Sequence, residues 1–393
     1  MKSKTPQNHQ SNEEQEAMTP LERFLTARVR TLELKLTSER DKNAALRSSM
    51  VGPSLLDQVE EAQALAESMN QEGEPFELFT EIGLKRLKAV KISHDHLTEK
   101  FRQIREVDRH RRLVLSKQQH VDAVEKLGEK YKNFSGFINE FVVPQLYLQS
   151  LTKTPVRLQN FCLIGPPGVG KTAFLTELSE VLELGGAIFD ANSIQSSAVL
   201  NGLTRQFGNA DVGLLFENMV FGRTQAGRMN PGNALFCVDE IEKMGKSDQL
   251  GSSFDLMLAL LEKQTARRFV DVCAPELVLN LEHINWGFTS NSLEHVSAPL
   301  RSRLIQVEIP APTPEQSLEI ASGIYEEEIS KLKGKVERIP DVSYPDLEQI
   351  ASHSPRQQKQ LIQLAIAKAV RNGAESIELV STEKKSTVRM GFL

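Results

Sequence analysis

The pattern of apolar and polar residues along the chain changes near residue 131. Before that point a polar stretch is followed by apolar residues at helical spacing, whereas beyond it short apolar runs alternate with amphipathic stretches. Helical spacing predicts helices, and the second pattern is typical of strands and helices that alternate to build a parallel sheet. We therefore predict a disordered tail over residues 1–17, a helical region over 18–130 and an α/β domain over 131–311.

Five apolar runs in the α/β region predict strands. They cover residues 161–164, 186–190, 234–239, 284–290 and 304–309. Past residue 310 the strand signals fade, and helical spacing over 315–333 and 355–372 predicts a small helical domain over residues 312–393. Because ligands of open parallel sheets bind at the carboxyl ends of the strands, the polar residues that end these runs are the first candidates for a site.

The helical region divides at turn-forming residues near 51–54 and 72–75. Before the first turn, residues at the a and d spacing of a heptad are Leu25, Val29, Leu32, Leu36, Asn43 and Leu46. This series fits a short coiled coil and equally fits one amphipathic helix packed against its own chain. We expect a second helix over residues 54–70 and a long helical tract over residues 76–127.

Residues 85–117 form a basic tract, in which eleven lysines and arginines stand against four acidic residues. A solvated helical face accounts for such a tract, and so does contact with a polyanion. Aromatic residues on which bases would stack are nearly absent from it, which favours the solvated face. The net charge of −5 gives the chain as a whole no attraction to nucleic acid.

Composition excludes several classes of protein. The chain is 40% hydrophobic and 25% charged, as ordinary soluble proteins are. Its three cysteines, Cys162, Cys237 and Cys273, form no C-x-x-C pair and are expected to be reduced and buried. The N-terminus lacks the apolar core of a signal peptide, and no run of about 18 apolar residues occurs. We therefore expect a cytoplasmic protein without a membrane segment.

The most informative motif follows the first predicted strand. Residues 165–172 fit G-x-x-x-x-G-K-[ST] and are Gly165, Pro166, Pro167, Gly168, Val169, Gly170, Lys171 and Thr172. Such a loop wraps its backbone N–H groups around phosphate oxygens, while the lysine reaches the terminal phosphates and the hydroxyl can bind Mg²⁺. A helix predicted over residues 173–182 adds the positive end of its dipole. The sequence therefore predicts a nucleoside triphosphate site.

Two further strand ends carry side chains suited to hydrolysis of that nucleotide. Asp239 and Glu240 follow one apolar run, so that one carboxylate can face a metal ion while the other polarises the attacking water. Asn291 ends the next run, where its amide can donate to phosphate and accept from water. Asparagine at a strand end is also common turn chemistry, so Asn291 alone is a weak signal.

Three arginines are candidates for neutralising charge on a transferring phosphoryl group. Arg301 and Arg303 precede the last predicted strand, and Arg356 opens the last long helix. The planar, permanently charged guanidinium group donates two hydrogen bonds at once to phosphate oxygens. Arg356 is placed to touch the phosphates from the helical domain and close that domain over the nucleotide.

With these motifs in this order, residues 133–371 resemble the AAA+ ATPases, and among them the ATPase module of the Lon proteases and its stand-alone bacterial relatives. The motifs that carry the resemblance are GPPGVGKT at 165–172, LFCVDEIEK at 235–243, TSNS at 289–292, APLRSRL at 298–304 and SPR at 354–356. The resemblance implies an α/β fold class: an AAA+ P-loop NTPase with a parallel sheet flanked by helices, followed by a small helical lid domain and preceded by the helical N-terminal segment.

The resemblance also implies a role for each candidate residue. Lys171 and Thr172 match Walker A, Asp239 and Glu240 match Walker B, Asn291 matches sensor 1, Arg303 matches the arginine finger that acts in trans, with Arg301 as its alternative, and Arg356 matches sensor 2. ATP with Mg²⁺ on Thr172 and Asp239, and a homo-oligomeric ring of six copies, are implied in the same way. The adenine pocket is placed no more closely than near Phe134 and Ile138.

The sequence also departs from the Lon pattern. Lon proteases continue into a serine-lysine peptidase domain, whereas this sequence ends at Leu393, soon after Arg356, so proteolysis is not expected. Ring translocases of this class grip polypeptide with an aromatic residue and a glycine in a loop after the second strand. Phe207 and Gly208 occupy roughly that position, and Phe207 fits a pore residue and a core residue equally well. The glycine-rich residues 221–232 look like an exposed loop.

Two hypotheses for function follow. The first is a Lon-like ATPase that couples ATP hydrolysis to the remodelling or threading of a protein client. The second is a nucleic-acid-associated ATPase or loader that binds phosphates with the basic tract, in which case its nucleic-acid affinity would fall steeply with salt.

Overall fold

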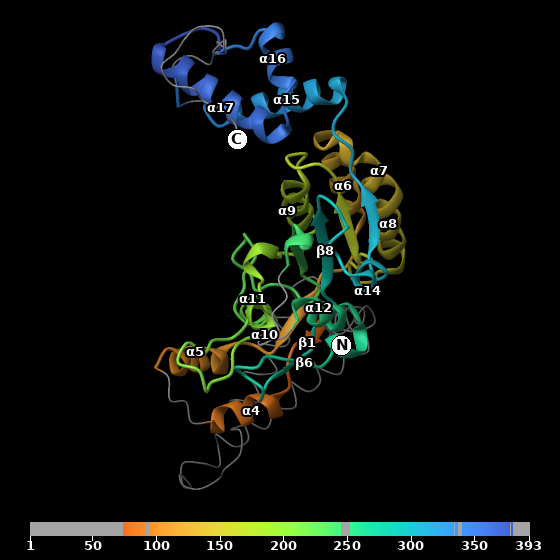
Figure 1. The fold of residues 1–393 in the computed structure, drawn as a ribbon, viewed down its shortest axis with the longest axis vertical. Helices are drawn as coiled ribbons and strands as arrows, with labels where there is room; N and C mark the ends of the chain where they lie inside the picture. The colour runs from red at the N-terminus through yellow and green to blue at the C-terminus, as the bar shows by residue number, and fades with distance from the viewer. Residues whose placement is uncertain are drawn as a thin grey trace, which may run out of the picture.

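The computed structural model describes residues 74–90, 95–244, 252–333, 335–336, 340–377 and 379. The predicted tail, the heptad series and the helix over 54–70 lie outside the described residues. Figure 1 shows a central sheet with the C-terminal helices α15 to α17 at one end of the molecule and α4, α5 and β1 toward the other.

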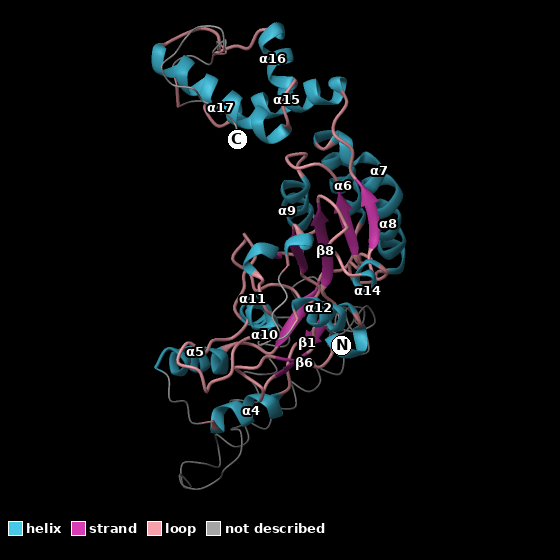
Figure 2. Ribbon diagram, in the orientation of Figure 1, coloured by secondary structure: helices cyan, strands magenta, loops and turns pink. Residues whose placement is uncertain are grey.

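The central sheet consists of five parallel strands in the order β4-β5-β8-β3-β9. Their bounds are β3 (Phe161–Ile164), β4 (Gly186–Asp190), β5 (Leu235–Asp239), β8 (Asn285–Ser290) and β9 (Ile305–Glu308). All five predicted strands are confirmed. β8 and β5 flank each other and β8 also pairs with β3, so the three strand ends that carry the candidate residues meet at one edge of the sheet (Figure 2).

The three central strands, β5, β8 and β3, are buried because helices cover both faces of the sheet there, whereas the edge strands β4 and β9 are partly exposed. Along β5, Phe236 and Val238 belong to one core cluster, while Leu235 and Cys237 belong to the other. The first cluster gathers side chains from α10, α11 and α12, and the second gathers side chains from α6 to α9. The three cysteines are buried and free, as expected.

The helices around the sheet are mostly short. They are α6 (Gln118–Lys130), α7 (Ser135–Phe137), α8 (Val143–Thr152), α9 (Lys171–Val181), α10 (Ser197–Asn201), α11 (Leu214–Val220), α12 (Ser253–Leu261), α13 (Lys263–Ala266) and α14 (Ala298–Arg301). Single turns add η1 (Lys132–Phe134), η2 (Ile138–Val142), η3 (Ala191–Ser193) and η4 (Ile241–Lys243), and β6 (Phe269–Val270) pairs antiparallel with β7 (Val278–Leu279).

The long helical tract expected over residues 76–127 is wrong. Before α6 the chain instead forms β1 (Glu74–Glu77), α4 (Glu81–Ala89), α5 (Asp95–Glu106) and β2 (His110–Leu113), with β1 antiparallel to β2. The Thr80 hydroxyl accepts from the Gly83 backbone N–H at 3.2 Å and starts a new helix directly after β1. Phe76 and Leu113 join the same core cluster as the helices on one face of the central sheet. Tertiary packing therefore overrides the helical spacing of this tract.

The C-terminal helices form a separate small core. They are α15 (Pro314–Ser330), α16 (Tyr344–Ala351) and α17 (Pro355–Asn372), and the first and last confirm the predicted runs. Each of these helices has a Ser or Thr as its N-cap, namely Thr313, Ser343 and Ser354. Each also has a proline in its first turn. Within the described residues, no helix combines the length and apolarity needed to cross a membrane.

Candidate nucleotide-binding site

The loop between β3 and α9 has the backbone that its glycines permit. Gly168 and Gly170 adopt positive φ values of 82° and 100°, which are strained for residues with a Cβ atom. Gly170 is the N-cap of α9, so the first turn of that helix, with its free N–H groups, begins at Lys171. The sequence motif therefore folds into a loop that presents backbone donors and the positive end of a helix dipole.

Lys171 is mostly buried, at 7% exposure, and its ammonium group is held by hydrogen bonds. Its Nζ donates to the carbonyl oxygens of Gly165 and Pro166 at 2.6 and 3.0 Å and to Asn291 Oδ1 at 3.1 Å. Burial lowers the pKa of Lys171, and the charge of Asp239 acts in the opposite direction. The ammonium group is thus aimed at the end of the loop before any anion binds.

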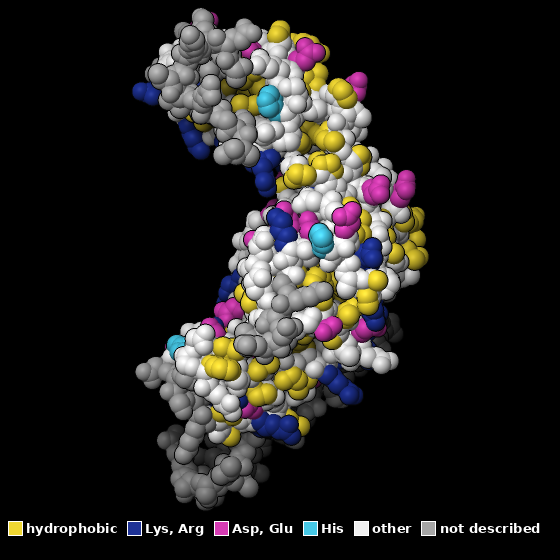
Figure 3. All heavy atoms as spheres, in the orientation of Figure 1, with side chains coloured by type: hydrophobic (Ala, Val, Ile, Leu, Met, Phe, Trp, Pro, Cys, Tyr) yellow, Lys and Arg dark blue, Asp and Glu magenta, His cyan; other side chains and the backbone are white. Residues whose placement is uncertain are grey.

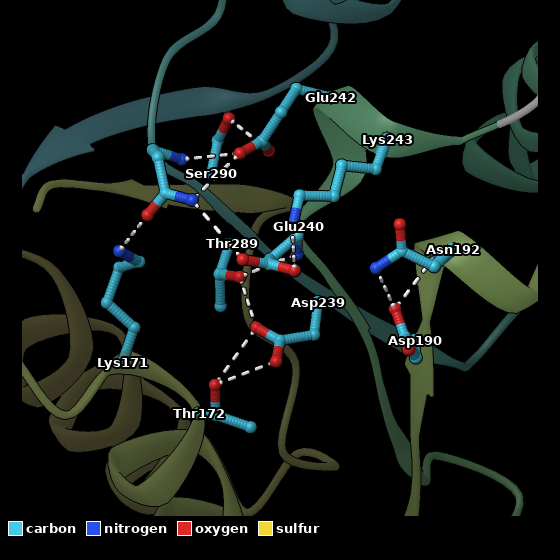
Figure 4. Close-up of polar contacts among 11 residues, drawn as sticks. Lys171, Thr172, Asp190, Asn192, Asp239, Glu240, Glu242, Lys243, Thr289 and Ser290 are labelled. Atoms are coloured by element: carbon cyan, nitrogen blue, oxygen red, sulfur yellow. Dashed lines mark hydrogen bonds and ion pairs between the residues drawn. The ribbon is translucent and has the colours of Figure 1, made fainter. Parts of the chain in front are cut away.

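Thr172 and Asp239 meet across the gap between α9 and β5. Thr172 Oγ1 donates to both carboxylate oxygens of Asp239, at 3.0 and 2.9 Å (Figure 4). The buried Thr289 hydroxyl, from the neighbouring strand β8, also donates to Asp239 Oδ1. The same Thr289 oxygen accepts from the backbone N–H of Glu240 at 2.9 Å. Thr289 therefore fixes both acidic residues at the end of β5.

Glu240 turns out of the strand through a left-handed backbone conformation, with φ at 56°. Non-glycine residues in this region are uncommon and cluster at functional sites. Its Oε2 pairs with Lys243 Nζ at 2.7 Å and its Oε1 accepts from Asn291 Nδ2 at 3.3 Å. The hydrogen bond from Lys243 is the main reason that the pKa of Glu240 is lowered. The carboxylate is therefore ionised at neutral pH and can polarise a water molecule.

Asn291 links the lysine of the loop to the acidic residues. Besides its bonds to Lys171 and Glu240, its Nδ2 donates to Glu242 Oε1 at 3.1 Å, and its backbone N–H donates to the same oxygen at 3.0 Å. Glu242 also accepts from Ser290 Oγ at 2.7 Å. Sequence reasoning missed Glu242, because its position in η4 gives no signal until the chain folds β8 against η4.

A cavity of about 820 Å³ opens between these residues and the C-terminal helices. This volume lies within the range of sites for ligands of nucleotide size. The outline of the molecule is notched beside the C-terminal helices (Figure 3). The lining includes the loop residues from Pro167 to Thr172, together with Asp239, Glu240, Asn291, Tyr131, Asn133, Glu327 and Arg356. Arg356 is exposed on α17 and lines the same cavity as the loop.

Phe134 and Ile138, near which the adenine pocket is expected, lie in the core beside the cavity. Both side chains are buried in the core, at 0% and 1% exposure, and do not line the cavity. Tyr131 lines it instead, with its hydroxyl donating to Glu177 Oε1 at 2.8 Å. The apolar side chains of this segment pack into the core, whereas Tyr131 and Asn133 face the cavity, so the position of an adenine pocket stays a prediction.

Neither Arg301 nor Arg303 lines the cavity of its own chain. Arg303 is 37% exposed and its Nε pairs with Glu262 Oε1 at 2.9 Å. Arg301 ends α14, in the segment that leads into β9. Both guanidinium groups therefore lie outside the residues that line the cavity of their own chain.

The donor set around Thr172 fits a magnesium ion that arrives with a nucleotide. Mg²⁺ prefers oxygen ligands and is usually held by one or two carboxylates together with phosphates and water. Thr172 Oγ1 and the Asp239 carboxylate supply a hydroxyl and a carboxylate already in contact. No group of three His, Cys, Asp or Glu side chains that could hold a metal ion occurs among the residues that the structure describes. Phosphate and water oxygens would therefore have to complete the coordination.

Comparison with known proteins agrees with this site. The family model described as "ATPase family associated with various cellular activities (AAA)" matches residues 161–311. Lon protease 1 of Bacillus subtilis is 30% identical over 183 residues, which cover 47% of this chain and 22% of that protein. The Lon protease of Clostridium acetobutylicum is 28% identical over 184 residues, with the same coverage of 47% and 22%. The chain thus spans about a fifth of the length of these relatives.

A solved structure of Saccharomyces cerevisiae Hsp104 in complex with casein is also similar. It is 13% identical and has a TM-score of 0.49, over 65% of this chain and 48% of that chain. At that identity and score the likeness carries no functional argument. The family match and the strand order of the sheet agree: residues 161–311 match the AAA family model and have the AAA+ fold, and this region is similar to part of the Lon proteases.

Proposed function

We propose that the chain hydrolyses ATP in the cavity at Lys171 and couples hydrolysis to the remodelling or threading of a protein client. The observation that carries the proposal is the hydrogen-bonded group of Lys171, Thr172, Asp239, Glu240 and Asn291 at one end of that cavity. These side chains supply a cation, a metal-binding pair, a base and an orienting amide, which are the parts that phosphoryl transfer to water requires.

In the proposed mechanism the residues act mainly by positioning and by electrostatics. Lys171 exchanges its carbonyl partners for oxygens of the terminal phosphates. The ionised Glu240 accepts a hydrogen bond from the attacking water and polarises it, while Asn291 holds that carboxylate and the water in line. Mg²⁺, when bound at Thr172 and Asp239, neutralises phosphate charge. Arg356 touches the phosphates from α17 and couples the C-terminal helices to the state of the nucleotide.

The proposal includes a homo-oligomeric ring, of six copies. Arg303 lies outside the cavity of its own chain, so its guanidinium group would reach the γ-phosphate only in the site of a neighbouring copy. A ring with a head-to-tail interface places such a neighbour at every site. Arg301 is the alternative finger. The proposal is confined to ATP hydrolysis and the work coupled to it, and peptide-bond cleavage is no part of it.

The composition of the basic tract suggests nucleic-acid binding, but the contacts of its side chains weaken that alternative. Several of its cations are already paired with acids: Lys85 with Glu81, Lys100 with Asp211 and Glu217, Arg102 with Glu99 and Glu106, and Arg109 with Glu77. The buried Arg111 donates to the carbonyls of Met219 and Val220 at the end of α11. Charge that is neutralised inside the fold contributes little to phosphate binding. We therefore favour a protein client.

Phe207 is the candidate for contacting that client. Its side chain is 49% exposed, so the core alternative for this residue is wrong. An exposed aromatic side chain flanked by the open Gly208 suits contact with an extended polypeptide without regard to its sequence.

The test compares steady-state ATP hydrolysis with an unfolded protein, single-stranded DNA and duplex DNA, each in turn. We expect only the unfolded protein to stimulate hydrolysis. Phe207→Ala should lower that stimulation about fivefold or more, the effect of losing one aromatic contact worth about 1 kcal/mol. Tyr344→Ala removes an aromatic side chain that is 64% exposed on α16 and serves as the matched control. Stimulation by DNA alone would favour the loader instead.

A further inference from the structure

The loop that carries Phe207 has an exposed tip on a base that is closed by a hydrogen bond. It runs between α10 and α11, and the Leu203 N–H donates to the Asp211 carbonyl at 3.0 Å across its two ends. Ala210, beside that closure, is fully buried, whereas residues 206–209 at the tip are exposed. The direction in which Phe207 points is therefore set at the base of the loop.

Helix α5, from the N-terminal segment, holds this base at three points. His96 Nε2 donates to the Ala210 carbonyl at 2.8 Å, and Lys100 Nζ donates to Asp211 Oδ1 at 2.8 Å. The ring of Phe101 lies 5.8 Å from the guanidinium carbon of Arg205. His96 and Lys100 are one helical turn apart and so share a face of α5. Figure 1 shows α5 lying alongside the loops near α10 and α11.

Lys100 also connects the loop to the helix that follows it. Its ammonium group lies 3.0 Å from Glu217 Oε2 in α11 as well as 2.8 Å from Asp211 Oδ1. The lysine side chain is 23% exposed. Burial would lower the pKa of Lys100, but the hydrogen bonds and charges of the two acids outweigh burial and raise it. The ion bridge is therefore charged throughout the physiological pH range.

Lys85 and Arg102, two other cations of the tract, make a different kind of contact from Lys100. Lys85, in α4, pairs within its own helix, with Glu81 at 2.5 Å, and is 65% exposed. Arg102 likewise pairs with Glu99 and Glu106 in α5. Such local, exposed pairs contribute little to the placement of other segments. Lys100 instead contacts Asp211, which lies 111 positions further along the sequence.

We propose that α5 sets the position of the Phe207 loop and that Lys100 is the positioning residue. The inference rests on the proposed function, in which Phe207 contacts the client. A loop held at its base gives up less conformational entropy when its tip binds, so anchoring raises affinity for the client without adding a contact. The described part of the N-terminal segment thus acts on client binding through the loop, not by binding the client with its basic side chains.

Hydrogen exchange of the full chain tests the anchoring, without client or nucleotide. In Lys100→Met, backbone amides of residues 203–211 should exchange about fivefold faster or more than in the wild type, because the base opens more often. Lys85→Met removes a paired lysine of the same tract and should leave this exchange unchanged. Lys100→Arg keeps the charge and should restore slow exchange. Equal exchange in Lys100→Met and Lys85→Met overturns the inference.

Titration of ATP hydrolysis with an unfolded protein tests the consequence. Lys100→Met should raise the client concentration for half-maximal stimulation about fivefold while the rate at saturating client changes little, because the loop is mispositioned and Phe207 is intact. A thermal melt of each variant separates this effect from global destabilisation, and Glu217→Gln weakens the same bridge from the other side.

The outcomes separate the two claims. If Phe207→Ala leaves client stimulation unchanged, the client-contact role fails, and the anchoring is decided by hydrogen exchange alone. If Phe207→Ala abolishes stimulation while Lys100→Met leaves the half-maximal concentration unchanged, the positioning role of Lys100 is overturned and the proposed function stands.

Discussion

Glu240→Gln is expected to leave ATP bound and to lower kcat about 10²- to 10⁴-fold, the usual contribution of a positioned general base. The substitution keeps the shape of the side chain and its bond with Asn291 but removes the charge that polarises water. Filter binding or fluorescence of a labelled ATP measures retention, and phosphate release measures turnover. Because Lys171 and the loop backbone are unchanged, nucleotide affinity should remain close to that of the wild type.

The matched control for this variant is Glu294→Gln, which neutralises an exposed carboxylate beyond the end of β8 and outside the cavity. It should turn over ATP as the wild type does. Unchanged turnover in Glu240→Gln would rule out Glu240 as the base, and the hydrogen-bonded Glu242 would then be the next carboxylate to test.

Arg303→Ala is expected to lower kcat about 10³-fold or more, as loss of an arginine finger does. A mixture of Arg303→Ala with Glu240→Gln provides the stronger test. Each variant is expected to be inactive alone, and an active site can form only where an Arg303→Ala copy supplies Glu240 and its neighbour, a Glu240→Gln copy, supplies Arg303. In a random one-to-one mixture, about a quarter of the sites combine an intact Glu240 with an intact Arg303 from the neighbour. Phosphate release by the mixture should therefore recover well above the sum of the two variants.

Glu262→Gln controls for the ion pair that Arg303 makes within its own chain. It breaks the same pair but keeps the guanidinium group, so its turnover should stay near that of the wild type. If the mixture shows no recovery, Arg303 does not act in trans. Recovery in a mixture made with Arg301→Ala, and none with Arg303→Ala, would assign the finger to Arg301.

Much of the fold could be predicted because the three central strands of the sheet are buried on both faces. Short continuous apolar runs such as residues 161–164 and 234–239 are typical of strands buried in this way, and the loop motif between the first run and a helix indicates a phosphate-binding loop. The meeting of Asp239 and Asn291 followed from placing both at carboxyl ends of strands. The parallel pairing of β5 with β8 puts these ends side by side.

The features that sequence reasoning missed depend on contacts between distant segments. β1 and β2 are short, and what fixes them is the packing of Phe76 and Leu113 against Gly232, where even a Cβ atom would lie 2.6 Å from the Phe76 ring. Glu242 gained its place beside Asn291 only through the turn at Glu240. Within the basic tract, Lys100 and Arg109 have acidic partners that lie outside it, at Asp211, Glu217 and Glu77. None of these contacts leaves a local pattern.

Steady-state phosphate release by the wild-type chain, measured beside Lys171→Ala, tests the central claim most directly. Both proteins are assayed with ATP and Mg²⁺, with and without an unfolded protein client, at concentrations that allow copies to assemble. The account predicts that the wild type releases phosphate and that Lys171→Ala, which lacks the cation at the end of the loop, does not. Equal rates in the two proteins, or no release by the wild type under any of these conditions, would contradict it.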